Sequence, residues 1–525
     1  MSLIQFKNFR RFPDDRFYKI PYKDITILVG KNNSGKSTMV KALLLVIEYL
    51  KSGSVNNFDF ANLNLENTNI VTFGRAKNKN SNTNVISFAL ELQGFTIEID
   101  ISGDDDDATV QVDLVRLSAH ELHMIEAGHM HQFLIIPNEK KVNFSRYKVN
   151  LFKAFGSVEN NEDQETQSQI DKIENQISGF KKDLLDLDKS TKEFVEKNQT
   201  YKKLEDKLKI LKKSIKKNKT VKNEEYSFEL EYLSDDSLQN ILKDTSDIAS
   251  RMTKEKVKNI KGLSANQADK PFSNFMAFKE QKRNIDSLLK FAFKSISDIN
   301  IYYLPSNPAK QSALFRIKDK QNALAQAIHE FYQITKNRKE NEAHRFIKKW
   351  MDNEKGFEIG EDIEIIMRAS EAYELNVIDN GKSIPLADKG MGSIQAMLLI
   401  IRIAVIVEKT QDKDYNPLVI IEEPELNLHP ALQSRLCDFF LEVYEKYNIQ
   451  FIIESHSEYL IRKSQVFVKE REYEKKPNNN PFSVMYFDKF LDNIYEMRYR
   501  EDGRFENEFG KGFYDEAANL TLDLL

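Results

Sequence analysis

The stretch ITILVGKNNSGKST, from Ile25 to Thr38, decides the fold class. It begins as an apolar run typical of a buried strand and continues into a turn rich in glycine, asparagine and serine. A helical pattern, Met39 to Leu50, follows. The turn satisfies G-x-x-x-x-G-K-[ST] in the strand–loop–helix context that this motif requires. Its glycines allow backbone N–H groups to face phosphate oxygens, and the helix N-terminus adds positive charge. The sequence therefore predicts a phosphate-binding P-loop.

Each part of this loop has an expected role. Lys36 pairs with the β- and γ-phosphates of ATP, and the hydroxyl of Ser37 ligates Mg²⁺. The expected nucleotide contacts are Gly30, Lys31, Asn32, Asn33, Ser34, Gly35, Lys36, Ser37 and Thr38.

A second stretch, NPLVIIEEPELNLHP from Asn416 to Pro430, supplies an acidic site. An apolar strand ends there in two glutamates. We expect Glu422 to hold the metal and Glu423 to orient or deprotonate the attacking water. The alternative is a strand ending in a solvated acidic turn, and the P-loop in the same chain favours the catalytic interpretation.

Two further motifs lie near this one along the chain. FIIESHSEYL, Phe451 to Leu460, is a predicted buried strand followed by His456, which could contact the γ-phosphate. LADKGMGSIQAML, Leu386 to Leu398, has Gly390 and Gly392 before a predicted helix. It offers a second glycine-lined helix N-terminus that could bind phosphate. This motif is weak evidence by itself and becomes strong because it lies between the P-loop and the paired glutamates along the chain.

Composition limits the function classes. The chain has 525 residues, 41% of them hydrophobic, and a net charge of -4, so several domains are expected and nucleic-acid binding would need local patches. A single cysteine, Cys437, excludes an internal disulfide framework and a cysteine zinc site. The N-terminus lacks a signal-peptide core, and the apolar run Ala396 to Val407 contains Arg402 and is short for a membrane span. We expect a cytoplasmic protein with no membrane contact.

The chain divides into three regions of different texture. Strand patterns dominate residues 1–157: Ile25–Val29, Val85–Leu92, Phe95–Ile101 and Thr109–Val115. Residues 158–299 are rich in charge, with an apolar 3-4 repeat over 170–187 that predicts a coiled-coil hairpin or one interrupted helix. Residues 300–525 alternate helices and strands, including Val419–Glu422 and Phe451–Ile453. We predict one split α/β ATPase domain with a mixed sheet and flanking helices, interrupted by a helical insertion.

The chain resembles the ABC-type ATPases of the SMC, RecF and OLD group. The resemblance rests on four motifs: the P-loop, the glycine-rich signature, the stretch EEPELNLHP and a late SHS. The opening FKNFRRF, the stretch YYLPSNPAKQSALF and the closing EDGRFENEFGKGFYDEAANL add to the resemblance. It implies that Gly390, Gly392, Ser393 and Gln395 form the signature. It also implies that Glu423 is the catalytic glutamate, that His456 is the switch histidine, and that Asn427 to His429 lie in the D-loop. Lys389 stands where a serine is frequent, and neither Gln93 nor Gln132 is a convincing Q-loop residue.

In such ATPases the signature of one subunit closes over the ATP of another, so the resemblance implies a nucleotide-gated homodimer with ATP and Mg²⁺. The chain is similar to the Septu-type and retron-associated ATPases of bacterial anti-phage defence, which work with a separately encoded HNH nuclease, so the resemblance implies an ATPase that regulates such a nuclease. The alternative is a RecF- or SMC-like repair ATPase that clamps DNA. A transporter ATPase is disfavoured. Few residues follow His456, so we expect no nuclease activity in this chain.

Three charged or histidine-rich segments have two interpretations each. Ten lysines between 202 and 222 could bind a DNA or RNA backbone or form a solvated coiled-coil flank. The acids Asp104–Asp107 could bind a cation, but we favour a hairpin turn. His120, His123, His129 and His131 could bind zinc, but we favour a surface helix and loop.

Overall fold

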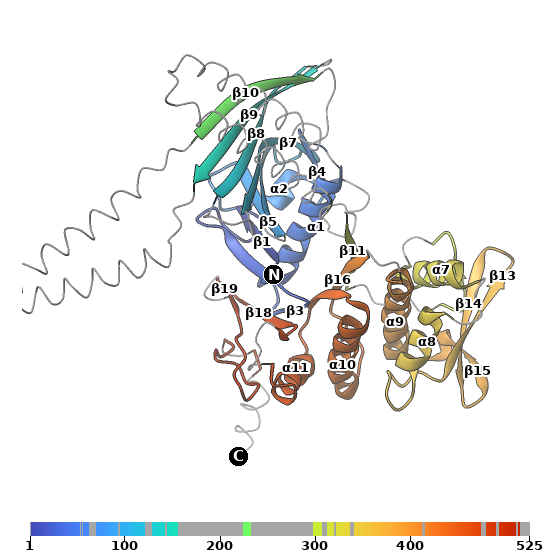
Figure 1. Cartoon of the computed structure of the whole chain (residues 1–525). Helices are drawn as coiled ribbons and strands as arrows, with labels where there is room; N and C mark the ends of the chain where they lie inside the picture. Colours follow the sequence, from blue (N-terminus) through green and yellow to red (C-terminus); the bar gives the residue numbers. More distant parts are fainter. Residues whose placement is uncertain are drawn as a thin grey trace, which may run out of the picture.

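The computed structural model describes residues 2–52, 54, 56–61, 70–92, 95–120, 129–141, 144–155, 224–232, 294, 298–306, 312–319, 322–336, 341–411, 415–473, 479–489, 493–510 and 513–514. Within these residues three sheets and their flanking helices make up the fold (Figure 1).

A six-stranded sheet lies at the centre and carries the P-loop. Its order is β11 (Ile299–Leu304), β16 (Asn416–Glu422), β17 (Gln450–Glu454), β3 (Ile25–Gly30), β18 (Phe482–Asp488) and β19 (Asn493–Glu496). The first five strands run parallel and β19 is antiparallel to β18. Ile27 and Leu28 of β3 belong to different hydrophobic clusters, so the sheet is buried on both faces, as parallel sheets are. The predicted strands at 25–29, 419–422 and 451–453 are confirmed.

The helices cover this sheet in two layers. On one face, α1 (Lys36–Ser52) follows the P-loop and packs into the cluster shared with the large sheet. On the other face lie α9 (Met391–Lys409), α10 (Pro430–Tyr447) and α11 (Glu458–Glu470). Figure 1 shows α10 and α11 below the central strands and α9 beside α7 (Ala323–Thr335) and α8 (Glu342–Met351).

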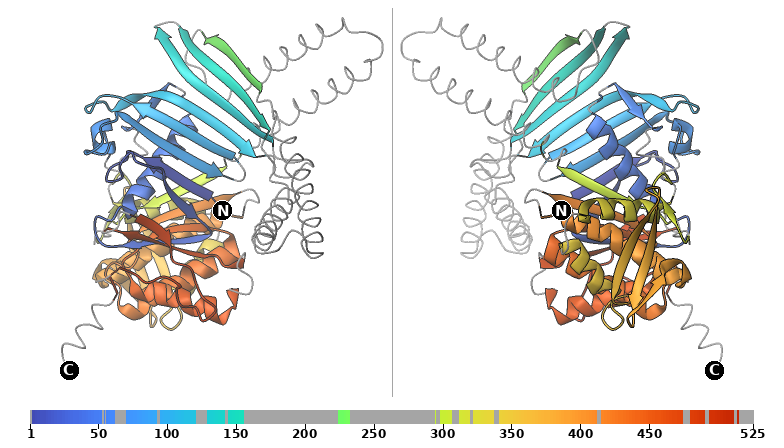
Figure 2. Two further views of the ribbon diagram at one scale, coloured as in Figure 1. Left: turned by 90° about the vertical axis from the view of Figure 1, so that its left-hand side faces the viewer. Right: turned by 90° about the vertical axis from the view of Figure 1, so that its right-hand side faces the viewer.

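A nine-stranded antiparallel sheet rises above α1 (Figure 2). Eight of its strands form the path β10-β9-β8-β7-β6-β5-β1-β2, and β4 pairs with β7. Their bounds are β1 Ser2–Lys7, β2 Tyr18–Tyr22, β4 Asn57–Asp59, β5 Val85–Leu92, β6 Phe95–Ser102, β7 Thr109–His120, β8 His129–Lys141, β9 Phe144–Phe155 and β10 Glu224–Tyr232. A four-residue helix, α2 (Phe73–Ala76), precedes β5.

Strand β10 corrects the predicted organisation. It lies inside the segment 158–299, which we expected to be helical, and it pairs antiparallel with β9. That segment is therefore not helical throughout. The predicted coiled-coil hairpin and the lysine-rich run at 202–222 lie outside the described residues.

Two smaller expectations concern the turns and histidines of the large sheet. Asp104–Asp107 forms the β6–β7 turn, with Asp107 N donating to Asp104 O at 3.0 Å, so the hairpin turn is confirmed. The described histidines of the cluster are not on the expected helix, because His120 ends β7 and both His129 and His131 lie on its partner β8. His123 lies outside the described residues.

A four-stranded sheet completes the fold at the end away from α11. It contains β12 (Phe315–Arg316), β13 (Asp362–Arg368), β14 (Ala372–Asp379) and β15 (Lys382–Pro385), and α7 and α8 cover it. A single 3-10 turn, Leu386–Asp388, then leads from β15 into α9. This small sheet thus positions the glycine-rich N-terminus of α9.

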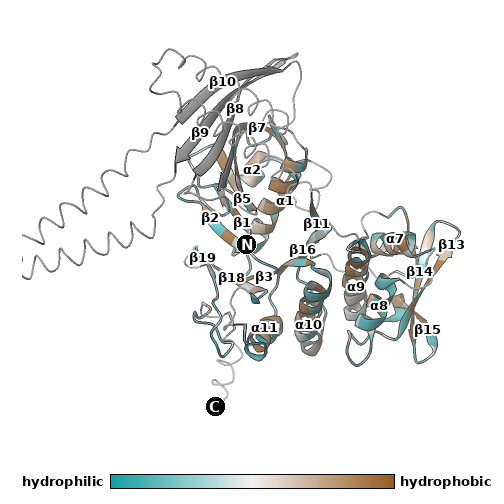
Figure 3. Cartoon of the chain, in the orientation of Figure 1, coloured by the Kyte–Doolittle hydropathy of each residue, from teal (hydrophilic) through white to brown (hydrophobic). Residues whose placement is uncertain are grey.

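Helix α9 is longer than the apolar run seen in the sequence, and by length and hydropathy alone it could cross a membrane. Its most apolar window is 72% buried inside the protein, as expected of a core helix. Arg402, which interrupts the run, donates to Ala323 O at 3.1 Å and pairs with Glu330. Figure 3 shows hydrophobic residues along both α9 and α1, the helices that pack on opposite faces of the central sheet. The α/β ATPase fold predicted from sequence is confirmed.

Candidate nucleotide-binding site

The chemical motifs meet where three parallel strands end. The P-loop follows β3, the paired glutamates end β16, and the segment with His456 follows β17. Glu422 stands opposite Glu454 in the β16–β17 register, and Glu454 stands opposite Leu28 of β3. Carboxyl ends of parallel strands lie at one edge of a sheet, where α/β proteins bind ligands. The pairing therefore brings together side chains that lie about 400 residues apart in sequence (418 residues from Lys36 to Glu454).

The P-loop backbone has the conformation that its glycines allow. Gly35 has φ +109°, and a Cβ there would lie 2.6 Å from the ring of Phe12. The loop continues directly into α1, which begins at Lys36. Lys36 is buried, and its Nζ donates to Gly30 O at 3.1 Å across the mouth of the loop. A buried ammonium held in this way is ready to pair with phosphate oxygens.

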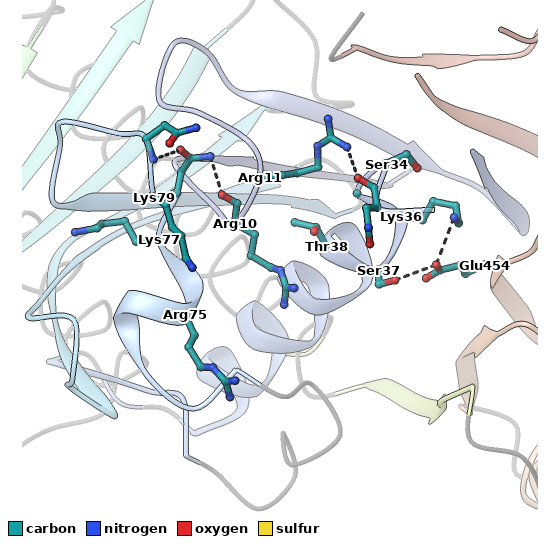
Figure 4. Close-up of a pocket in the computed structure, with 14 residues that line it drawn as sticks. Arg10, Arg11, Ser34, Lys36, Ser37, Thr38, Arg75, Lys77, Lys79 and Glu454 are labelled. Atoms are coloured by element: carbon teal, nitrogen blue, oxygen red, sulfur yellow. Dashed lines mark hydrogen bonds and ion pairs between the residues drawn. The ribbon is translucent and has the colours of Figure 1, made fainter. Parts of the chain in front are cut away.

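Glu454 is the side chain closest to both reactive P-loop residues. Its Oε1 accepts a hydrogen bond from Ser37 Oγ at 2.9 Å and lies 3.8 Å from Lys36 Nζ (Figure 4). Burial raises its pKa to about 7, and the positive charge of Lys36 opposes that rise. Its second oxygen, Oε2, is buried and has no hydrogen-bond partner among the described residues.

Glu422 lies beside Glu454 at the end of the neighbouring strand. Its Oε2 accepts from the backbone N–H of Ser306 at 3.3 Å, and its buried Oε1 has no partner in the described part of the chain. Tyr303 also contacts Glu422, and burial together with this carboxylate raises the pKa of the phenol. One oxygen thus remains available for a cation or its water shell.

Glu423 and His456 form a second pair near Lys36. Glu423 has a left-handed backbone, φ +48°, and its N–H donates to Glu454 O at 2.7 Å. Its Oε1 lies 3.8 Å from His456 Nε2, and His456 N donates to Glu425 Oε1 at 2.6 Å. Burial and then the charge of Lys36 lower the pKa of His456 to about 4. The imidazole is therefore neutral at pH 7 and can act as donor or acceptor toward phosphate.

A pocket of about 560 Å³ opens from the P-loop and is rich in cations (Figure 4). Beyond Lys36 its walls include five basic side chains, from the β1–β2 connection and from the segment around α2: Arg10, Arg11, Arg75, Lys77 and Lys79. Arg10 is half-buried and near Arg75, and both effects lower the pKa of the Arg10 guanidinium. An anionic ligand would relieve that repulsion, as a nucleotide does.

The signature residues do not line this pocket. Gly390 is the N-cap of α9, and Lys389 pairs with Asp379 at 2.9 Å. A Cβ on Gly392 would lie 2.6 Å from Asn427 O, so the signature packs against the predicted D-loop of its own chain. Ser393 and Gln395 also lie on α9, away from the residues that surround Lys36. One chain therefore supplies only part of the predicted set.

Several expected residues remain without a structural placement or were missed. Gln93 lies outside the described residues, and Gln132 lies on β8 without settling the Q-loop. Sequence reasoning assigned no role to Glu454, although it stands in the quoted FIIESHSEYL. It also gave no role to Arg10, Arg11 or Arg75, since basic residues near a strand end are common on surfaces. Glu454 could have been predicted by looking for an acidic residue at the end of the strand that neighbours the P-loop strand.

The chemistry of these side chains fits Mg²⁺. A serine hydroxyl and two carboxylates with unpartnered buried oxygens are the hard oxygen donors that this ion takes, together with waters and phosphates. Within the described ranges no preformed group of three or more His, Cys, Asp or Glu ligands exists.

A parallel sheet with a P-loop on one strand and paired glutamates on another defines a P-loop ATPase. Residues 1–461 match the AAA_15 family, described as AAA ATPase domain, and the chain belongs to that family. No curated protein matches the chain.

Solved structures that match the chain include heads of Smc proteins. The Smc head domain with an extended coiled coil, bound to the C-terminal domain of ScpA and derived from Pyrococcus furiosus, shares 11% identity at a TM-score of 0.34, with both chains covered to 100%. The SMC head domain from Thermotoga maritima shares 11% identity at a TM-score of 0.28, with 92% and 93% covered. At these values the likeness places no individual residue.

Proposed function

We propose that this chain binds and hydrolyses Mg²⁺·ATP, with Lys36 and Ser37 holding the phosphates and metal and Glu423 activating water. One observation carries the proposal: Glu454, at the end of β17, contacts the P-loop residues Lys36 and Ser37 and accepts from the backbone N–H of Glu423. Glu423 in turn lies 3.8 Å from His456. When bound, Mg²⁺ would neutralise phosphate charge and be held by Ser37 and Glu422. Glu423, in contact range of a neutral histidine, would orient the water and accept its proton.

We also propose that the working unit is a homodimer. The signature residues Gly390, Gly392, Ser393 and Gln395 lie away from the pocket around Lys36. A second pocket, of about 460 Å³, adjoins Lys31, Asn32 and His456 on the side where the γ-phosphate would lie. The N-terminus of α9 from a second copy could close this side of the nucleotide. ATP would then join two chains, and hydrolysis would release them.

The biological setting that we propose is anti-phage defence in the bacterial cytoplasm, with this ATPase regulating a separately encoded HNH-type nuclease. Its support is the sequence resemblance to Septu-type and retron-associated ATPases. The alternative is an ATPase of DNA repair or recombination that clamps DNA when its dimer closes. Both share the same site chemistry, so only partners and nucleic-acid behaviour separate them.

Two measurements test this proposal. The purified chain should release phosphate from ATP only when Mg²⁺ is present, and absence of turnover and of ATP binding would overturn the ATPase assignment. The chain should also co-purify with a nuclease encoded beside it, and their joint expression should reduce phage plating. Stable ATP-dependent closure on duplex DNA by this chain alone, without such a complex, would favour repair over defence.

A further inference from the structure

We propose that Glu454 is a positioning residue that aims the Ser37 hydroxyl at the metal and makes nucleotide binding depend on that metal. The proposal deepens the proposed function and rests on it, because it concerns the same Mg²⁺·ATP site. The observation behind it is the hydrogen bond from Ser37 Oγ to Glu454 Oε1, 2.9 Å long, at a buried position next to Lys36.

The hydrogen bond sets the direction of the hydroxyl. A serine hydroxyl has one proton and two lone pairs, and it can ligate a cation only through a lone pair. Because Ser37 donates its proton to Glu454, its lone pairs point away from β17. A carboxylate acceptor also increases the electron density on the hydroxyl oxygen. Partners of this kind orient metal ligands and strengthen them.

Glu454 also ties the two halves of the site together through its backbone. Its carbonyl accepts from Glu423 N at 2.7 Å, which holds the left-handed turn at the predicted catalytic glutamate. Its side chain meanwhile contacts two consecutive residues of the P-loop. One residue at the end of β17 therefore positions a metal ligand and fixes the segment that carries the base.

The charge of Glu454 has a second consequence. Only 6% of the residue is exposed, and its Oε2 has no partner among the described residues. ATP without a metal would bring its phosphates next to this carboxylate and next to Glu422, where like charges repel. A divalent cation between them removes that repulsion. Glu454 thus opposes metal-free nucleotide and favours the metal complex.

A matched control exists elsewhere in the same sheet. On β18 and β19, Ser483 Oγ donates to Glu496 Oε1 at 3.0 Å, and Lys23 Nζ lies 3.8 Å from Glu496. This is the same serine–glutamate–lysine arrangement, outside the pocket around Lys36. Changing Glu496 to glutamine removes one carboxylate from a like arrangement that is more exposed, without touching the nucleotide site.

The experiment compares Glu454→Gln with wild type and with Glu496→Gln by calorimetric titration of ATPγS, in EDTA and in Mg²⁺. The readout is the ratio of the two dissociation constants, metal-free over metal-bound. We expect Glu454→Gln to lower this ratio by about tenfold or more, because second-shell changes typically cost 10–100-fold in metal affinity. Metal-free affinity should stay equal or increase. Glu496→Gln should leave the ratio at the wild-type value.

Equal weakening of both affinities in Glu454→Gln, or an unchanged ratio, would overturn the proposal, since either result indicates a merely structural role. The Ser37→Ala background adds a second test, a double-mutant cycle. There, Glu454→Gln should change the ratio by less than it does with Ser37 present, because the target hydroxyl is gone and only the charge of Glu454 still acts. An equal change in both backgrounds would mean that Glu454 acts through its charge alone, which contradicts positioning through Ser37.

Failure of this proposal and failure of the ATPase assignment give different results. If wild type binds ATPγS in neither buffer, the proposed function is wrong. If wild type binds and discriminates, but Glu454→Gln does so equally well, only the role of Glu454 is wrong. Circular dichroism and melting of Glu454→Gln confirm that the titrated protein is folded, and Glu454→Asp supplies a charged variant that should retain part of the ratio.

Discussion

At the scale of single residues, Glu423 is the side chain on which turnover should depend. It follows the buried strand β16 and has a left-handed backbone, held by its N–H bond to Glu454 O. Glu423→Gln keeps the size and that backbone bond but removes the proton acceptor. We expect the rate of phosphate release to fall by about 10²- to 10⁴-fold, the usual contribution of a general base, with ATP binding kept. Phosphate release and nucleotide titration measure the two effects.

Lys36→Ala provides the contrast for that variant. It removes the ammonium that spans the loop to Gly30 O, so ATP binding itself should weaken. If Glu423→Gln retained turnover within tenfold of wild type, the general base would be another residue. Loss of ATP binding in Glu423→Gln would likewise contradict its role as a base alone.

His456 gives a prediction that depends on pH. Its pKa is lowered to about 4 by burial and by the nearby charge of Lys36. The γ-phosphate would bring negative charge to this position, so a bound ATP analogue should raise the pKa toward the ordinary value of about 6.5. Histidine ring NMR, with the resonance assigned by its loss in His456→Gln, measures both midpoints. A midpoint near 6.5 without nucleotide would show that the ring is not held as the structure has it.

The same shift has a stability consequence whose sign follows from linkage. The folded pKa lies below the unfolded one, so the unfolded chain binds this proton first as the pH falls. The contribution of neutral His456 is therefore complete above about pH 6.5 and is lost as the pH decreases toward 4. The free energy of unfolding of wild type, relative to that of His456→Gln, should therefore decrease as the pH is lowered from about 6.5 to 4.

The residues of the site differ in how well the sequence predicts them. Lys36, Ser37, Glu422, Glu423 and His456 belong to motifs whose local context already indicates their chemistry, and the structure brings them together. Glu454 could not be assigned in this way, because its importance comes from the pairing of β17 between β16 and β3. A local pattern does not specify which strands become neighbours. An acid at a strand end is as typical of a solvated turn.

At the scale of elements, the N-terminus of α9 offers a matched pair of glycines. A Cβ on Gly392 would lie 2.6 Å from the backbone oxygen of Asn427, whereas a Cβ on Gly390 would meet nothing within 4 Å. Gly392→Ala should destabilise the protein by about 1–3 kcal/mol from the steric clash, partly offset by up to about 1 kcal/mol of helix propensity. Gly390→Ala should change the stability by less than about 0.5 kcal/mol.

Thermal melting followed by fluorescence measures this difference. A net loss of 1 kcal/mol corresponds to a decrease of roughly 2–4 °C in melting temperature for a unit of 150–250 residues. Equal melting of the two variants would mean that α9 and the Asn427 turn do not pack as closely as the structure shows.

The elements themselves illustrate what pattern reading can and cannot predict. The predicted strand at 85–92 matches β5, and that at 95–101 matches β6 to within one residue, because alternating apolar residues there face a core on one side. Strand β10 was missed, since its sequence EEYSFELEY lies within a lysine- and glutamate-rich segment with a helical repeat. Its pairing with β9, which ends about seventy residues earlier (155 to 224), supplies a stabilisation that no local window contains.

At the scale of the whole molecule, the separation of the signature from the P-loop has a direct consequence. The pocket around Lys36 lacks any residue of α9 among its described lining, and so does the second pocket beside His456. If a second copy completes the site, residues from two chains must cooperate in each hydrolysis event. A site that was complete within one chain would not need such cooperation.

Mixed dimers test this arrangement. One variant is Lys36→Ala, and the other is Ser393→Asp, which places a negative charge at the signature and avoids the clash expected at Gly392. Each variant alone should be inactive. An equimolar mixture should regain about a quarter of wild-type turnover, since about half of the dimers are mixed and each has one intact composite site of its two.

Two different affinity tags establish that mixed dimers form and allow their isolation. Isolated mixed dimers with no turnover would contradict a site shared between two chains. That result is expected if each site lies within one chain, because each chain of the mixed dimer then carries one defect. Recovery of activity would assign the missing wall of the nucleotide pocket to the α9 N-terminus of the partner.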